Sequence, residues 1–108
     1  MKMIRAIVRP EKADAVANAL LEANFPAMTR MDVYGRGKQK GLQVGTIFYD
    51  ELPKHMIMLV CQDEDEEIIA NIIMDNAYTG SDGNYGDGRI FVTPVLKAYT
   101  VSSRTSGL

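Results

Sequence analysis

Two segments with the apolar repeat of a helix alternate with four segments that have the pattern of strands, and this order limits the folds open to the chain. Pro10 stops the first strand and suits the first turn of the first helix. The acidic run 63–67 suits the positive N-terminus of the second helix. Two glycine-bearing loops, 35–53 and 79–88, interrupt the pattern. The predicted elements are strand Met3–Arg9, helix Glu11–Asn24, strand Met28–Tyr34, strand His55–Cys61, helix Asp63–Asn76 and strand Arg89–Val95.

This order predicts an α+β fold, a ferredoxin-like βαββαβ sandwich in which two helices pack on a four-stranded antiparallel sheet. Two helices cover only one face of such a sheet, yet the third strand is apolar on both faces along Met56–Val60. We expect identical subunits to bury the second face, and a tail or loop that folds over it is the alternative. At 108 residues the chain is predicted to form one domain, 1–108.

Composition argues against several classes of protein. Apolar residues make up 46% of the chain and charged residues 24%, as in ordinary globular proteins. The net charge of −2 gives no field that attracts nucleic acid or a membrane surface. Cys61 is the only cysteine and cannot form an internal disulfide, and no apolar run reaches the length that spans a bilayer. We therefore expect a cytoplasmic protein with no nucleic acid partner and no membrane insertion.

The two glycine-bearing loops are candidates for binding an anion. The first opens with Gly35-Arg-Gly-Lys-Gln-Lys-Gly41, where closely spaced glycines and three cations suit a phosphate. It lacks the context and ending of a P-loop, so a solvated hairpin tip is an equal alternative. The second, Thr79–Arg89, contains four glycines and ends on a cation, and it lacks the bidentate glutamate of a calcium loop. Together the two loops favour a polyphosphate ligand.

A catalytic constellation is not evident in the sequence. His55 is the only histidine, with no apparent nucleophile or carboxylate partner, and we expect it at the surface at a strand end. Cys61 ends an apolar strand and is expected to be a buried core thiol. The chain is therefore not expected to be an enzyme, and a slow nucleotide hydrolase is the remote alternative.

The whole chain resembles the PII family of nitrogen signal transducers. The resemblance is carried by Met1–Pro10, Ala27–Thr29, Gly35–Gly41, Leu52–Lys54 and Gly86-Asp-Gly-Arg-Ile-Phe-Val92. It implies an effector-binding T-loop at about 37–53, a B-loop at about 79–89 and a C-terminal tail at about 97–108. It also implies trimers that bind ATP or ADP between neighbouring subunits, with Mg²⁺ and with 2-oxoglutarate as effector.

The resemblance assigns particular residues to these ligands. Those implied for nucleotide binding are Thr29, Gly35, Gly37, Lys38, Gln39, Val60, Gly86, Asp87, Gly88, Arg89 and Arg104. Those implied for 2-oxoglutarate are Gln39, Lys40, Gly41 and Lys54. Gln39 is also implied to hold Mg²⁺ together with the ATP phosphates and 2-oxoglutarate.

Three departures from the family pattern bear on function. Ile47 stands where some members carry the tyrosine that is modified, so control by nucleotidylation is not expected. Five residues, Ser81–Tyr85, lie in the B-loop where the family usually has two, and no phosphate contact can be assigned to them. Thr100 and Ser102 stand in place of two tail arginines that reach a neighbouring subunit's nucleotide, and Arg104 is the cation nearby.

The short T-loop, with eleven residues between Gly41 and Pro53, is most similar to that of the nitrogenase-regulating PII proteins of the NifI type. These act in pairs of related chains and bind the nitrogenase component that carries the active-site cofactor. They block it when nitrogen is plentiful, and 2-oxoglutarate with ATP releases them. The resemblance implies the same role here, in a homotrimer or a mixed assembly with a paired PII-like chain. A general PII signal protein acting on an ammonium transporter or a nitrogen-assimilation enzyme is the alternative.

Overall fold

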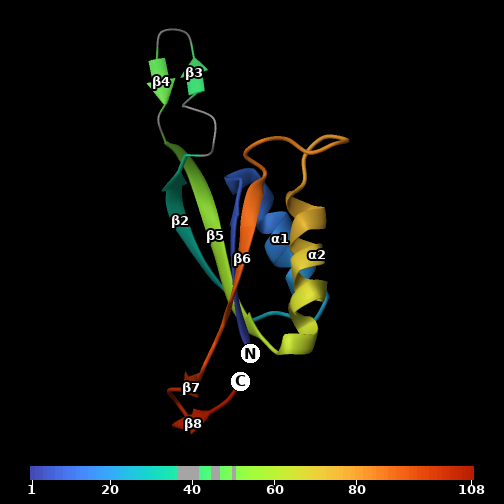
Figure 1. Ribbon diagram of the computed structural model, residues 1–108, viewed down its shortest axis with the longest axis vertical. Coiled ribbons are helices and arrows are strands. Elements are labelled where there is room, and N and C mark those ends of the chain that lie inside the picture. The colour runs from blue at the N-terminus through green and yellow to red at the C-terminus, as the bar shows by residue number, and fades with distance from the viewer. Residues whose placement is uncertain (37–41, 45–46, 50) are drawn as a thin grey trace.

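The computed structural model describes residues 1–36, 42–44, 47–49 and 51–108, and it confirms the predicted order of the main elements (Figure 1). The main strands are β1 (Lys2–Val8), β2 (Thr29–Gly35), β5 (Leu52–Cys61) and β6 (Gly88–Pro94), and the helices are α1 (Pro10–Glu22), η1 (Asp63–Asp65, 3₁₀) and α2 (Glu66–Ala77). The short strands are β3 (Leu42–Val44), β4 (Ile47–Tyr49), β7 (Tyr99–Thr100) and β8 (Thr105–Ser106). None of the helices in these described ranges combines the length and apolar character that a membrane span requires.

The four main strands form one antiparallel sheet in the order β2-β5-β1-β6. Figure 1 shows α1 and α2 side by side on one face of this sheet. The two strands that precede helices, β1 and β5, therefore lie at the centre, and the strands that follow helices, β2 and β6, lie at the edges. This is the predicted ferredoxin-like sandwich, and the expected fold class is confirmed.

The core lies between the sheet and the helices, and alternate residues of the central strands face it. From the two helices the same core receives residues at helical spacing, as the periodicity predicted. Cys61 is buried there, which agrees with the expected core thiol. The buried residues are Ile4, Ala6, Val8, Ala13, Val16, Leu20, Ile57, Leu59, Cys61, Ile69, Ile73 and Ala77.

The second face of the sheet, which we call the open face, carries an apolar row as well as charged residues such as Arg5 and Arg89. The strand register places Ile7, Met56 and Met31 in one row across it. Met31 is 39% exposed, and Phe91, which β6 contributes to the open face, is 48% exposed. The tail hairpin β7–β8 lies beyond the end of the sheet and not over this face (Figure 1). The tail therefore does not cover the open face, and burial between subunits stays a prediction.

Several boundaries differ from those expected. The segment 35–53 was expected to be a loop, but β2 extends to Gly35, β5 begins at Leu52, and β3 and β4 pair as a hairpin between them. The residues of β3 and β4 favour strands, and the surrounding glycines hid this signal. A second unexpected hairpin, β7–β8, lies in the tail. The acidic run begins with the 3₁₀ turn η1, so α2 starts three residues later than predicted.

Candidate functional site

The base of the T-loop and the B-loop meet at one end of the sheet. Strands β2 and β5 run into the T-loop there, and the B-loop leads into β6 at the same end (Figure 1). Lys54 Nζ on β5 donates a hydrogen bond of 2.7 Å to the Gly86 carbonyl oxygen in the B-loop. A residue predicted for 2-oxoglutarate is thus in contact with a residue predicted for nucleotide phosphates.

The B-loop is organised around the carboxylate of Asp87. This group accepts hydrogen bonds from Thr79 Oγ1, from the Thr79 backbone N–H at 3.0 Å, from the Asn84 backbone N–H at 3.0 Å and from Arg9 Nε at 3.1 Å. Its side chain is only 17% exposed. Burial on its own would raise the pKa of Asp87, but the hydrogen bonds from Thr79, Asn84 and Arg9 hold that pKa well below the ordinary carboxyl value. Asp87 therefore stays ionised and holds the loop in place.

Arg9 is a residue of this site that the sequence did not reveal. Its Nε pairs with Asp87, and its Nη2 donates a hydrogen bond of 3.0 Å to the Tyr85 carbonyl oxygen. Arg9 directly follows β1, whose last residue Val8 pairs with Gly88 at the start of β6. In the sequence, the only sign of this role was a cation placed between the end of a strand and Pro10. The group that Arg9 binds could not be inferred, because it depends on the pairing of Val8 with Gly88.

Arg9 and Lys54 form a pair of cations under Gly86. A Cβ atom on Gly86 would lie 3.2 Å from Arg9 Nη2 and 3.6 Å from Lys54 Nζ. Partial burial of Lys54, and then the charge of Arg9, lower the pKa of Lys54 below its ordinary value. Two neighbouring cations beside a glycine-rich backbone form a site suited to an anion, which fits both a phosphate and a carboxylate.

The structure brings together only some of the predicted site residues. Gly35, Lys54 and the B-loop residues Gly86–Gly88 gather at one end. Thr29 and Val60 lie towards the other end of the open face. Val60 is four residues along β5 from the row that contains Arg89, about 13 Å away at strand rise. Gly37, Lys38, Gln39, Lys40 and Gly41 lie outside the described residues.

Arg104 is also far from the B-loop. It lies in the turn between β7 and β8 with φ of 57°, and this hairpin is at the opposite end of the molecule (Figure 1). A nucleotide at the B-loop of one chain is therefore far from Arg104 of the same chain. Assigning Arg104 to the same site requires that a second subunit supply it, as the resemblance implied for the tail.

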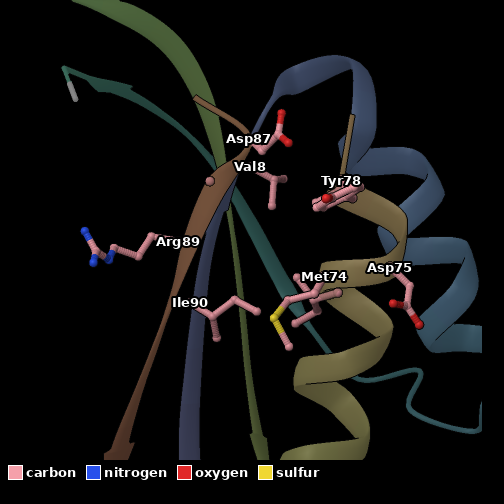
Figure 2. A pocket seen from close by; sticks show the side chains of 10 residues that line it. Val8, Met74, Asp75, Tyr78, Asp87, Arg89 and Ile90 are labelled. Atoms are coloured by element: carbon pink, nitrogen blue, oxygen red, sulfur yellow. The ribbon is translucent and has the colours of Figure 1, made fainter. Parts of the chain in front are cut away.

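A pocket of about 680 Å³ lies below the B-loop between β6 and α2 (Figure 2). Its wall is mostly apolar, with Met74, Tyr78 and Ile90 around Val8. Figure 2 shows that Arg89 extends to the other side of β6, away from these side chains. Neither Arg9 nor Lys54 lines the pocket, but Asp87 and Gly88 do, so the pocket adjoins the B-loop without including the cation pair.

His55 corrects one expectation. It was expected to be a surface residue without a carboxylate partner, but its side chain is only 22% exposed and its Nε2 lies 3.0 Å from Asp32 Oδ1. Its Nδ1 accepts a hydrogen bond of 3.2 Å from Arg30 Nε, and Arg30 also pairs with Asp14 on α1. The partner was missed because Asp32 meets it only across the β2–β5 pairing. In the described part of the chain, no three or more His, Cys, Asp or Glu side chains group into a metal site.

Comparisons with known proteins agree with this architecture. The family model described as "Nitrogen regulatory protein P-II" matches residues 1–105. The chain is 56% identical over 108 residues to a protein from Methanococcus maripaludis named "Nitrogen fixation nifHD region glnB-like protein 1". It is 54% identical to a similarly named protein from Methanothermobacter marburgensis and 50% identical to one from Methanosarcina barkeri. In all three cases the whole of both chains is covered. The fold, the family match and these relatives confirm the resemblance, and the chain belongs to the PII family of nitrogen regulatory proteins.

Proposed function

We propose that this protein senses ATP or ADP together with 2-oxoglutarate and inhibits nitrogenase by direct binding when nitrogen is sufficient. Membership of the PII family supports the regulatory role. The relatives named for nitrogen fixation regions support nitrogenase as the target. The observation that carries the proposal is the hydrogen bond from Lys54 to Gly86, because it joins the base of the effector loop to the predicted phosphate loop.

Nucleotide phosphates bind against the backbone of Gly86–Gly88, beside the cations Arg9 and Lys54. These two side chains balance part of the phosphate charge, and the glycines let the backbone approach closely. Mg²⁺ bound with ATP balances more of that charge. Gln39, outside the described residues, is the residue expected to help hold it.

Lys54 is the residue through which the effector acts. Its ammonium group is bound to a neutral carbonyl, that of Gly86. A carboxylate of 2-oxoglutarate forms the stronger, charge-assisted hydrogen bond and draws Lys54 towards itself. Because Lys54 stands near the start of β5, this movement changes the exit of the T-loop. A target that recognises only one T-loop conformation is then released by a shift in population.

The working unit in this proposal is a trimer, either of identical chains or mixed with a paired PII-like chain, in the cytoplasm. The open face supplies the contact surface. The position of Arg104 at the opposite end of the molecule from the B-loop is the reason to expect that a second subunit completes the site. One chain contributes Gly35 and Gly86–Arg89, and the tail of its neighbour contributes Arg104. The nitrogenase component that carries the active-site cofactor is the proposed partner.

The first test is calorimetric titration of 2-oxoglutarate into the protein with and without Mg-ATP. We expect binding only when Mg-ATP is present. The same protein, added to a nitrogenase assay from a related organism, is expected to inhibit activity and to lose this effect when both ligands are added. No binding of either ligand would contradict the sensing role. Capture of an ammonium transporter in place of nitrogenase, after ammonium is added to nitrogen-starved cells, would favour the general PII function.

Replacing Lys54 by methionine is expected to weaken 2-oxoglutarate binding by about 10-fold to 100-fold, since a hydrogen bond to a charged group is lost. Calorimetry in the presence of Mg-ATP measures this change. Lys2→Met removes a cation of the same type at the other end of β1, where Lys2 pairs with Cys61 and Pro94, and serves as the matched control. Equal 2-oxoglutarate affinity in the two variants would show that Lys54 does not contact the effector.

Replacing Phe91 by aspartate is expected to dissociate the assembly, because it places a charge on the proposed contact surface. Light scattering should then report the mass of one chain, 12.0 kDa, in place of a multiple of it. Leu21→Asp is the control, since Leu21 is 58% exposed on α1, on the opposite side of the molecule. A wild-type protein that is monomeric at micromolar concentration would refute the assembly outright.

A further inference from the structure

The segment Ser81–Tyr85, which makes this B-loop longer than is usual in the family, has a defined structure. Its path requires glycine at position 83, where φ is +75° and a Cβ atom would lie 2.8 Å from the Tyr78 ring. The segment therefore packs against the end of α2. It does not extend freely into solvent.

Asn84 connects this segment to both sides of the B-loop. Its side-chain amide, Nδ2, lies 2.9 Å from Thr79 Oγ1 and 3.3 Å from the Thr79 carbonyl oxygen. Its backbone N–H donates to Asp87, and its backbone carbonyl accepts from the Asp87 N–H at 3.1 Å. The first residue of the loop and the Gly-Asp-Gly sequence at its end are thus joined through Asn84.

Thr79 and Asp87 are also bonded to each other, so the three residues form a closed network. Thr79 donates to the Asp87 carboxylate through both its hydroxyl and its backbone N–H. Arg9 then fixes the same carboxylate to the end of β1. The conformation of Gly86–Gly88 is consequently held through the Asp87 carboxylate by Thr79, Asn84 and Arg9.

We propose that Asn84 is a positioning residue for nucleotide binding: acting through Thr79 and Asp87, it holds the Gly86–Gly88 backbone in the conformation that receives phosphates. This inference rests on the proposed nucleotide-binding function. It assigns a role to the inserted segment, which supplies an internal brace for the loop. A loop held in its binding conformation before the ligand arrives binds more tightly, because the apparent dissociation constant rises as the competent fraction falls.

If Asn84 positions the phosphate-binding backbone, the loss of affinity on its removal should depend on the number of phosphates in the ligand. Asn84→Ala is expected to raise the dissociation constant of ATP about fivefold to tenfold, and that of ADP by a similar or smaller factor. Adenosine has no phosphates to meet the loop, so its dissociation constant is expected to stay within about twofold. Calorimetric or competition titrations of all three ligands measure this. Ser81→Ala, which removes an exposed hydroxyl in the same segment, is the control.

A second pair of variants tests whether Asn84 acts through Thr79. Thr79→Ser keeps the hydroxyl group and should bind ATP like the wild type, whereas Thr79→Val loses that hydroxyl and should resemble Asn84→Ala. The double variant with Thr79→Val and Asn84→Ala should be no weaker than about the worse single variant, because both remove one network. This pair also keeps the proposal testable if Asn84→Ala fails to fold.

The outcomes separate the two proposals. Wild-type protein that binds ATP while Asn84→Ala binds it equally well overturns the positioning role and leaves the nucleotide function intact. An equal loss for ATP and adenosine also overturns it, because it indicates general disorder of the protein. Wild-type protein that binds no nucleotide overturns the proposed function, and the positioning role falls with it.

Discussion

Replacing Gly88 by alanine is expected to lower the free energy of unfolding by more than about 3 kcal/mol, a large part of the total stability of a small domain. Gly88 begins β6 with φ of +131°, a conformation that side chains rarely adopt. A Cβ atom there would lie 2.1 Å from the carbonyl oxygen of Ile7 and 3.2 Å from Cα of Val8. Both atoms belong to the backbone of central strand β1, which cannot move without disturbing the core.

Urea unfolding followed by circular dichroism measures this effect, with all variants at one protein concentration because assembly contributes to stability. Gly107→Ala is the matched control: φ is +106° there, but nothing lies within 4 Å of its Cβ position. Gly107→Ala therefore introduces the strain of a positive φ without a steric clash. We expect its free energy of unfolding to fall by only about 1–2 kcal/mol. If Gly88→Ala were no less stable than Gly107→Ala, the close approach of β6 to β1 would be wrong.

Replacing Asp87 by asparagine is expected to lower the free energy of unfolding by about 2–4 kcal/mol and to disorder the B-loop. The carboxylate accepts from four donors, two on each oxygen. An asparagine amide has only one oxygen, so in either orientation its NH₂ group faces donors from Thr79, Asn84 or Arg9. The ion pair with Arg9 is lost as well. Asp82→Asn, an exposed change in the same loop, is expected to have almost no effect.

The same carboxylate predicts how stability depends on pH. The pKa of Asp87 in the folded protein is below its value in the unfolded chain, which is about 3.9. Its contribution to stability is therefore complete above about pH 5 and is lost as the pH falls below about 4 towards the folded-state pKa. Urea unfolding at pH 7, 4 and 3 should show a loss of stability in the wild type that is smaller in Asp87→Asn. An identical pH dependence in both proteins would contradict the network around Asp87.

Much of the fold follows from local patterns in the sequence. Ile4, Ala6 and Val8 alternate along β1, and apolar residues recur at helical spacing along α1. The pattern of each segment therefore shows which of its sides is buried, even when the segments that pack against it are unknown. The order of these segments then restricts the topology to the ferredoxin-like sandwich. The short hairpins β3–β4 and β7–β8 escaped this reasoning, because strands of two or three residues carry too little periodicity to stand out from their loops.

The candidate site could also be predicted only in part from the sequence. Lys54 and the sequence Gly86–Arg89 could be assigned from their resemblance to family motifs, each within its own short stretch. Their contact could not, because Lys54 and Gly86 are 32 residues apart and meet only when β5, β1 and β6 lie side by side.

The tertiary structure alone decided the roles of Arg9, Asp87 and Asn84. Arg9 and Asp87 are 78 residues apart, and the pairing of Val8 with Gly88 brings them together. A shift of one residue in that register would turn each side chain to the other face of the sheet. The sequence by itself determined which residues are buried and in what order the elements form. The contacts that hold the B-loop depend on strand register, which is set by packing across the whole sheet and is not written in any local stretch of the chain.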